Sequence, residues 1–491
     1  MRSIASRLRA GSRAASAIAA LIFCSASPAY ASVRPKYGGT LRVELAARVA
    51  TLDPRMPSEE SASALAQERL DALLFDRLVR FNDRGTLEGV LAASWTSDDQ
   101  MKRWIFELRP NVKFADGMSL TADVAAQALG ATLGANFQVS GNALEVTIES
   151  SQPAPDLPER LATGRNFIFR VASDGSLAGT GPFKLDEWAP DGIPGRAVFL
   201  ANENCWFGRP FVDRVEVSLG VEPQRIEADL EFGLADLADL SPAELRRATQ
   251  RGVRVWSSKP SELLALVFDP QRPAVQDSRL RQAISLAVDR NAIATVILQR
   301  EAVPAGGLLP DWVSGYSFLF PTTLDVTHAR ALMQSAGSAA TVPLVLVYDA
   351  SDAETKAVAE RVAVNLRDAG IAMQTVASMN NGPQADARLV RLRIASPEPR
   401  AALLEIFAAL GITSVPPPAD VGPEALYAAE RTALADNRVV PLVHETQGSG
   451  LGANVRDWMA LDSGEWRLDD VWLERPAAGA PANQPAASGQ R

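Results

Sequence analysis

The stretch PLVLVYDASDAETKAVAERVAVNLRDAGIAMQTV, residues 343–376, decides the class of fold. It begins with PLVLVYD and ends with IAMQTV, each of which predicts a strand. Between them Val358, Val362 and Leu366 recur four residues apart, as on one face of a helix, and Gly370 supplies the stop. Strand, helix and strand at this spacing predict a βαβ unit, and therefore an α/β fold with a parallel sheet.

Similar patterns alternate along the rest of the chain. LLALVFDP, residues 263–270, is apolar almost throughout, which predicts a strand buried on both faces. A helix is expected over residues 61–79, where apolar residues recur at helical spacing. Thr121, Ser241 and Asp277 are expected to cap the helices that follow them. Since 491 residues are too many for one core, two or three domains are expected.

The first 31 residues have the three parts of a secretory signal peptide. Four arginines and no acid stand in this segment, an apolar run fills residues 14–26, and Ala29 and Ala31 frame a cleavage site. The run is shorter than the roughly 20 residues of a membrane-spanning helix. We therefore predict export to the periplasm, and removal of the four arginines takes the formal net charge from −9 to −13.

The cysteines and the end of the chain complete this part of the prediction. A lipoprotein signal ending at Cys24 calls for a small residue just before it, but Phe23 is bulky, so lipid anchoring at Cys24 is not expected. Without Cys24, Cys205 has no partner for an internal disulfide and is expected to be a small buried residue. Residues 475–491 are rich in Pro, Ala and Gly, which predicts a disordered tail.

Two glycines in GTGPFKLDEW, residues 179–188, raise the question of a phosphate site. A phosphate-binding loop calls for a lysine-bearing P-loop or a longer Gly-x-Gly-x-x-Gly that leads into a helix. Here GTGP leads into a strand pattern, so we expect the glycines to allow a tight turn where the chain passes between domains. The acidic net charge also lacks the basic footprint of a nucleic-acid partner.

No catalytic constellation stands out in the sequence. The two histidines, His328 and His444, are far apart in unrelated contexts, which argues against a metal cluster and a Ser-His-Asp triad. Paired carboxylates of the glycosidase kind cannot be singled out among 58 acids. We therefore expect neither an enzyme nor a metal or other cofactor.

Ten short motifs follow one another along the chain: YGGTLRV, TLDP, LAASW, RWIFELRPNVKFADGMSLTADV, GTGPFKLDEW, NCWFGRPFVDRVEV, DLSPAEL, LRQAISLAVDRNAI, HARALMQSAG and DNRVVPLVHE. In this order they resemble the solute-binding proteins of ABC importers in the dipeptide, oligopeptide and nickel class, known as family 5. The resemblance runs from about residue 37 to residue 475, and it rests on the order of the motifs more than on any one of them.

The resemblance implies a two-lobed periplasmic-binding-protein fold of class II, the Venus-flytrap type, with an extra inserted subdomain in lobe I. LLALVFDP and the strand near PLVHE are the expected crossovers between the lobes. The expected domains are a signal peptide over residues 1–31, lobe I over 32–80, 178–265 and 445–474, the inserted subdomain over 81–177, lobe II over 266–444 and the tail over 475–491.

The resemblance also implies a function and partners. It implies the extracytoplasmic substrate-binding component of an ABC importer, which captures a small solute, peptide-like or related, between its lobes. The partners would be that ligand and the membrane complex of permease and ATPase, with the binding protein a monomer. Peptides, nickel chelates, sugars and opines are all bound by similar folds, so the ligand stays open. The alternative is a divergent paralogue that acts as a sensor or scaffold without transport.

The ligand-anchoring stretch departs from the family pattern. Many members carry Trp-x-Ala-Asp-Tyr-x-Asp-Pro, whose first Asp holds the amino group of the ligand in peptide binders. The matching stretch here is LRIASPEP, residues 392–399, where Leu392 stands for the Trp, Ala395 for the Asp and Ser396 for the Tyr. A peptide held by its free amino group is therefore not supported by these residues.

Six residues remain as candidates for ligand binding: Ser58, Glu59, Asp269, Arg393, Ala395 and Ser396. Each of the first four also has a structural interpretation. Ser58 and Glu59 follow TLDP and would equally serve to cap the next helix. Arg393 would equally be a solvated strand residue, and Asp269 a hydrogen-bond acceptor at the hinge.

Overall fold

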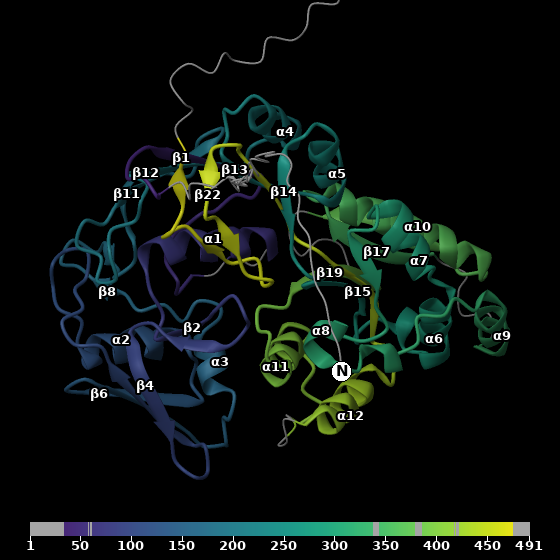
Figure 1. Ribbon diagram of the computed structural model, residues 1–491. Helices are drawn as coiled ribbons and strands as arrows, with labels where there is room; N and C mark the ends of the chain where they lie inside the picture. The colour runs from purple at the N-terminus through teal and green to yellow at the C-terminus, as the bar shows by residue number, and fades with distance from the viewer. Residues whose placement is uncertain are drawn as a thin grey trace, which may run out of the picture. The chain divides into compact units, whose positions relative to one another are not determined.

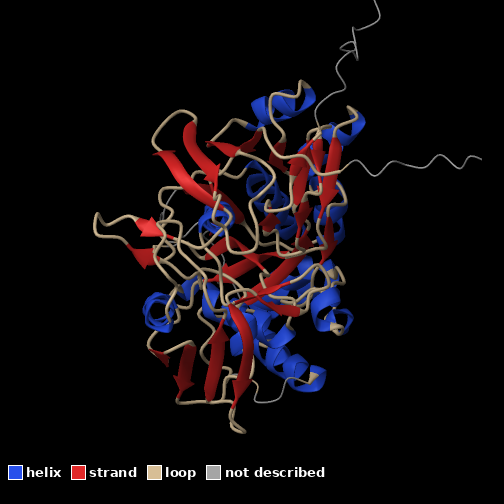
Figure 2. Ribbon diagram, turned by 60° about the vertical axis from the view of Figure 1, so that its left-hand side comes forward, coloured by secondary structure: helices blue, strands red, loops and turns tan. Residues whose placement is uncertain are grey.

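The computed structural model describes residues 34–56, 58, 61–336, 343–378, 385–416, 418 and 422–474. The predicted signal peptide, Glu59 and the predicted disordered tail lie outside these residues. The chain from Lys36 onward forms one compact unit. Helices and strands follow one another along it, which confirms the α/β class. Figure 2 shows both kinds of element by colour. Across the described residues, no helix combines the length and the apolar character needed to span a bilayer.

A seven-stranded mixed sheet forms around the strand predicted from TLRVEL. In spatial order its strands are β10 (Phe183–Ala189), β11 (Gly195–Ala201), β12 (Arg214–Leu219), β1 (Thr40–Leu45), β13 (Leu237–Leu240), β21 (Gly448–Leu451) and β14 (Arg254–Ser257). β1 pairs in parallel with both neighbours, Leu41 facing Val215 and Val43 facing Leu237. These four side chains are buried, so the strand lies in the middle of a core.

A six-stranded sheet contains the predicted βαβ unit (Figure 1). Its strands, in spatial order, are β16 (Ala302–Pro304), β20 (Val439–Glu445), β15 (Glu262–Phe268), β19 (Ala387–Arg393), β17 (Leu344–Asp349) and β18 (Met373–Ser378). β17 and β18 pair in parallel across α10 (Ala353–Asp368), which confirms the unit. Gly370 ends the helix with φ +80°. β15 is buried on both faces, as its apolar run predicts.

A third, antiparallel sheet forms within the region predicted as an inserted subdomain. Its strands, in spatial order, are β4 (Ala92–Ser97), β5 (Arg103–Leu108), β7 (Glu145–Ser150) and β6 (Phe137–Asn142). α2 (Ala122–Thr132) packs against β6 and β7. The side chain of Thr121 accepts a hydrogen bond from the Val124 amide and so caps this helix as predicted.

Two-stranded ladders join β2 (Val79–Phe81) with β3 (Leu87–Gly89), β8 (Arg170–Val171) with β9 (Leu177–Ala178), β22 (Val455–Arg456) with β25 (Trp472–Leu473) and β23 (Met459–Ala460) with β24 (Trp466–Arg467).

The helices confirm two further caps and correct one boundary. Ser241 and Asp277 cap their helices as predicted, Ser241 within a capping box. The helix expected over residues 61–79 ends at Leu74, because the next residues enter strand pairings: Asp76 bridges to Ile168. The remaining α-helices of the described residues are α1 (Ser61–Leu74), α3 (Leu157–Leu161), α4 (Pro223–Glu231), α5 (Pro242–Gln250), α6 (Ser278–Ala287), α7 (Arg290–Ala292), α8 (Asp311–Ser314), α9 (Val326–Ala336), α11 (Pro399–Ala409) and α12 (Pro423–Leu434).

The buried apolar residues separate into cores that belong to different sheets. Two clusters draw on residues 41–248 and 451–471, around the seven-stranded and four-stranded sheets. Two other clusters draw on residues 263–443, around the six-stranded sheet. The fold therefore has two lobes, the first containing the seven-stranded sheet and the second the six-stranded sheet. The exact domain boundaries stay a prediction.

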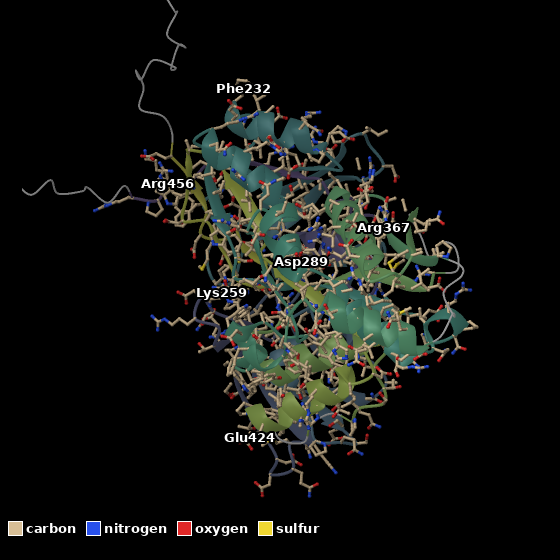
Figure 3. The ribbon with its side chains drawn as sticks, turned by 90° about the vertical axis from the view of Figure 1, so that its right-hand side faces the viewer. Phe232, Lys259, Asp289, Arg367, Glu424 and Arg456 are labelled. Carbon is tan, nitrogen blue, oxygen red and sulfur yellow. The ribbon has the colours of Figure 1, made fainter. Side chains whose placement is uncertain are left out.

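The chain passes between the two large sheets twice. It leaves β14 of the first lobe for β15 of the second, and it returns from β20 to β21. These passages adjoin LLALVFDP and PLVHE, where the crossovers were expected. Lys259, labelled in Figure 3, lies in the first passage and pairs with Asp462 at 3.0 Å. Cys205 is buried and is a free thiol, as predicted.

Candidate ligand-binding site between the lobes

A cluster of charged side chains joins the two lobes. Glu68 on α1 of the first lobe forms an ion pair with Arg393, the last residue of β19 in the second lobe. The two side chains are only 8% and 14% exposed. Arg77 donates a second hydrogen bond to Glu68 at 2.7 Å, so Glu68 lies between two guanidinium groups. We call Glu68, Arg77, Arg393, Thr163 and Glu405 the inter-lobe cluster.

The electrostatics of Glu68 depend on both guanidinium groups. Burial on its own raises the pKa of Glu68, but the charges of Arg393 and Arg77 outweigh burial and the pKa is lowered. The carboxylate is therefore ionised at neutral pH. Arg77 is held in place inside the first lobe, because it also binds Glu465 at 2.8 Å and the carbonyl oxygen of Gly164 at 2.6 Å.

Glu405 completes the inter-lobe cluster from the second lobe. Its carboxylate accepts a hydrogen bond at 3.1 Å from Thr163, which belongs to the first lobe. Burial raises the pKa of Glu405 to about 7, and the nearby charge of Arg393 opposes this shift only in part. At neutral pH a large share of the Glu405 carboxyls is therefore protonated, and this residue neutralises Arg393 incompletely.

A second ion pair joins the lobes further along α11. Arg400 pairs with Asp156, at the start of α3, and both side chains are almost fully buried. Arg400 also donates a hydrogen bond from Nε to the carbonyl oxygen of Pro418 at 2.9 Å. One oxygen of the Asp156 carboxylate has no hydrogen-bond partner among the described residues. This pair ties the first lobe to the second through buried charges.

A third group of charges surrounds Arg391 at the crossovers. This hinge cluster consists of Arg391 on β19 with Glu262, Glu445, Asp352 and Glu354. Arg391 is 3.1 Å from Glu262 and 3.1 Å from Asp352, and it also contacts Glu445. Glu262 begins β15 and Glu445 ends β20, so the cluster lies where the chain crosses between the lobes.

The excess of acid in the hinge cluster makes its stability depend on pH. Burial raises the pKa of Glu354 to about 8, in spite of Arg391, and the charges of Glu445 and Asp352 add to the shift. The folded protein therefore holds a proton that the unfolded chain releases near its ordinary value of 4.5. Stability from this group is present below about pH 4.5 and is lost as the pH rises towards about 8.

Replacing Glu354 by glutamine should remove part of this pH dependence. The amide keeps a polar group but carries no charge, so the variant is expected to be more stable than the wild type at pH 9, on the order of 1–3 kcal/mol, and nearly equal at pH 5. Urea unfolding at both values of pH measures this. Glu360→Gln on the exposed face of the same helix is the control. Equal gains in the two variants would contradict the assignment.

The structure brings two of the candidate residues to α1. The amide of Ser58 donates to the side chain of Gln67 at 3.0 Å, and Arg393 binds the next residue, Glu68. Ser58 and Arg393 thus meet neighbouring positions of one helix. Glu59 lies outside the described residues.

The other candidates lie in turns. Asp269 follows the end of β15 opposite to the crossover, where its carboxylate accepts from the amide of Gln271 at 2.8 Å. Ser396 is buried, and its hydroxyl accepts from the amide of Glu398 at 3.1 Å ahead of α11. Ala395 is half-buried beside it. Asp269 is therefore not brought to the inter-lobe cluster, and the binding roles of all six candidates stay predictions.

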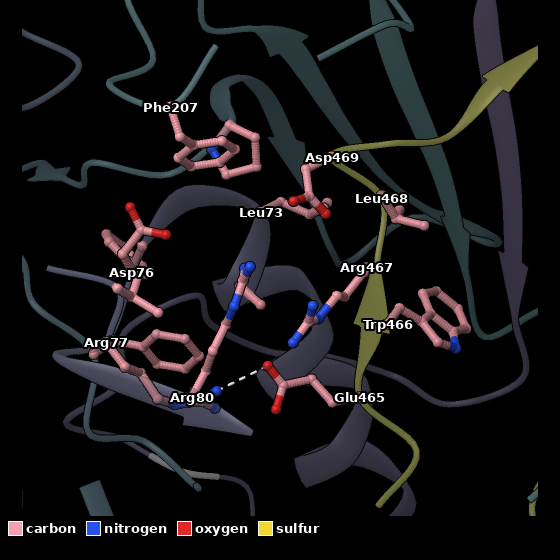
Figure 4. A pocket seen from close by; sticks show the side chains of 15 residues that line it. Leu73, Asp76, Arg77, Arg80, Phe207, Glu465, Trp466, Arg467, Leu468 and Asp469 are labelled. Carbon is pink, nitrogen blue, oxygen red and sulfur yellow. Dashed lines mark hydrogen bonds and ion pairs between the residues drawn. The ribbon is translucent and has the colours of Figure 1, made fainter. Parts of the chain in front are cut away.

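A small polar pocket lies within the first lobe beside the inter-lobe cluster (Figure 4). Arg77, Arg80, Arg467 and Asp469 are among its lining residues, and Arg77 belongs to both sites. The pocket encloses about 60 Å³, room for about four water molecules. Solute pockets enclose about 300–1,000 Å³, so this one does not fit a peptide-sized solute.

Two of the sequence motifs meet at this pocket. Asp76 accepts hydrogen bonds from Thr180 of GTGP at 2.8 Å and from the indole of Trp206 of NCWFG at 2.9 Å. These hydrogen bonds join the segment between α1 and β2 to the GTGP segment and to the loop after β11. Among the described residues, no group of three or more His, Cys, Asp and Glu side chains is arranged to hold a metal ion.

Two lobes with separate cores, joined by two crossovers and meeting through ion pairs, define a two-lobed binding protein of the periplasmic type. Residues 86–407 match the family model described as "Bacterial extracellular solute-binding proteins, family 5 Middle". This match covers more than half of the 491 residues, and the chain belongs to this family.

Several known proteins are similar to the chain. It is 26% identical over 343 residues to the nickel-binding periplasmic protein of Escherichia coli, covering 61% of this chain and 64% of that protein. It is 25% identical over 390 residues to the probable D,D-dipeptide-binding periplasmic protein of the same bacterium, covering 72% of each. The crystal structure of the ABC transporter substrate-binding protein CtaP from Listeria monocytogenes matches with a TM-score of 0.73 at 16% identity, covering 90% of this chain and 100% of that one. The chain thus spans about two thirds of the curated relatives it matches.

Proposed function

We propose that the chain is the extracytoplasmic substrate-binding component of an ABC importer. It captures a small solute, peptide-like or related, between its lobes and delivers it to a membrane complex of permease and ATPase. It acts as a monomer in the periplasm, exported by its signal peptide, and carries out no catalysis. The family and the periplasmic binding proteins among its relatives support this proposal. They give no support to the alternative of a sensor or scaffold.

One observation carries the proposal: each lobe has its own apolar core, and charged side chains join them. Parting the lobes therefore exposes groups that water solvates well and leaves both cores intact. A solute that contacts both lobes stabilises the closed state, because it makes those contacts only when the lobes meet. Two crossovers that carry the chain between the lobes leave them free to move as rigid bodies.

The position of Ala395 bears on the class of solute. An alanine offers no charge to the amino group of a peptide, and the neighbouring hydroxyl of Ser396 is already used in a turn. A solute anchored by an ammonium group at this place is therefore not favoured.

A thermal-shift screen of the mature protein tests the proposed function. Dipeptides, nickel chelates, sugars and opines form the panel, and titration calorimetry follows each hit. A solute at 100 times its Kd is expected to stabilise the protein by about 2.7 kcal/mol, a clear upward shift in Tm. If no solute class gives a saturable shift, the proposed function is wrong.

A further inference from the structure

We infer that the solute carries an anionic group, such as a carboxylate, which takes the place of Glu68 on Arg393 when the lobes close around it. This inference rests on the proposed function and names the chemistry of its ligand. It follows from how the charges of the inter-lobe cluster are shared between the lobes.

The two lobes contribute opposite charges to the cluster. The first lobe provides Glu68 and the second provides Arg393, which lie in direct contact with the lobes closed. A solute bound between the lobes has to enter between these two side chains or replace one of them. The charge of the solute therefore depends on which ionic partners remain to Glu68 and to Arg393 when their ion pair is broken.

Glu68 keeps a partner of its own lobe. Arg77 remains bound to it at 2.7 Å, and both side chains are nine-tenths or more buried. Arg77 is in turn fixed by Glu465 and by a backbone carbonyl group, so it does not follow the second lobe when the lobes part. The negative charge of Glu68 thus stays compensated in the open state.

Arg393 has no such ionic partner in its own lobe among the described residues. Among the described residues, its ion pair is the one with Glu68, and its other hydrogen bond, at 3.1 Å, goes to the carbonyl oxygen of Ser463 in the first lobe. Glu405 of the second lobe lies near, but it makes no ion pair with Arg393 in the described structure. When the lobes part, the guanidinium of Arg393 faces the gap without an ionic partner.

A neighbouring arginine shows the contrast. Arg391 lies two residues before Arg393, on the same face of β19. It contacts four acidic side chains, of which Asp352 and Glu354 lie at the start of α10 in its own lobe. Arg391 is therefore already compensated by its surroundings, whereas Arg393 is compensated only across the gap. On this face of β19, Arg393 is therefore the guanidinium that loses its described ionic partner when the lobes part.

An anionic solute satisfies this arrangement and a cationic one does not. A carboxylate on Arg393 restores a charge-assisted pair, and guanidinium geometry suits two parallel hydrogen bonds to it. An ammonium group on Glu68 would instead leave Arg393 enclosed without an anion, and a buried unpaired charge is strongly unfavourable.

The test measures how binding depends on the anionic group and on Arg393. Each solute that stabilises the protein in the thermal-shift screen is compared with its amide or methyl ester, for example N-acetyl-L-alanyl-L-alanine with its amide. The full mature chain is measured as wild type, Arg393→Gln, Arg393→Lys and Arg388→Gln. Arg388 is the matched control, because it is an arginine of the same strand an odd number of residues away and lies on the opposite face.

We expect the binding solutes to be anionic and to lose tenfold or more in affinity when the charge is removed. Arg393→Gln should lose the same factor, Arg393→Lys should keep the preference for the anion, and Arg388→Gln should bind like the wild type. Binding that survives both amidation and Arg393→Gln overturns this inference and leaves the proposed function intact. A screen without any binding solute overturns both.

Discussion

Replacing Arg400 by alanine is expected to part the lobes. Among single changes of the residues that join the lobes, it should give the largest loss of stability. The substitution leaves Asp156 buried without its counter-ion, in a place where one of its oxygens already lacks a partner among the described residues. Breaking a buried ion pair by removing one partner destabilises by about 3–5 kcal/mol. The closed arrangement should lose up to this amount.

The protein has one way to recover part of this loss. Opening the lobes brings water to Asp156, because the pair joins α3 of the first lobe to α11 of the second. We therefore expect Arg400→Ala to increase the radius of gyration in small-angle scattering and to lower the unfolding midpoint in urea. Both changes together distinguish lobe opening from a local defect.

Arg251→Ala is the matched control for this prediction. Arg251 pairs with Glu231 at 3.0 Å within the first lobe, and the two side chains are 47% and 39% exposed. An exposed pair contributes about 1 kcal/mol or less, so this variant should unfold almost like the wild type and scatter like it. If Arg400→Ala behaves no differently from Arg251→Ala, the buried pair does not hold the lobes together.

Local features of the fold follow from the sequence because their causes are local. The βαβ unit depends on the spacing of Val358, Val362 and Leu366, and the cap at Thr121 depends on residues three positions apart. α1 ends at Leu74, five residues before the end that helical spacing predicts at residue 79, because Asp76 pairs with distant Ile168. Long-range partners override helical spacing at this point.

The site could be predicted only in part for the same reason. Arg393 stands out because it lies beside the changed anchoring stretch, but its partner Glu68 is 325 positions away in the sequence. The sequence of α1 holds one signal of the site. Glu68, Arg69 and Asp71 stand there among apolar residues, and all three charged side chains are buried in the structure. Buried charges on a helix call for partners from other elements, and the sequence does not say which ones.

GTGP shows how a glycine pair is explained by packing. Neither Gly179 nor Gly181 has a positive φ, so the turn expected there is not the reason for them. A Cβ atom on Gly179 would lie 1.9 Å from the carbonyl oxygen of Leu74, and one on Gly181 would lie 2.6 Å from the carbonyl carbon of the same residue. The segment passes directly over the end of α1, where the Gly181 amide donates to the Leu74 oxygen at 3.0 Å.

Gly179→Ala is therefore expected to destabilise the protein by roughly 3 kcal/mol, since the overlap is with backbone atoms and no side chain can turn away to relieve it. Gly130→Ala is the control, because Gly130 lies on the exposed face of α2 with nothing within 4 Å of its Cβ position. That change should instead stabilise by about 0.5–1 kcal/mol, as alanine does in a helix. Urea unfolding of both variants measures whether each change lowers or raises the free energy of unfolding. A Gly179→Ala protein as stable as the wild type would show that the end of α1 can move away from this segment, and that close backbone approach is not what requires the glycine.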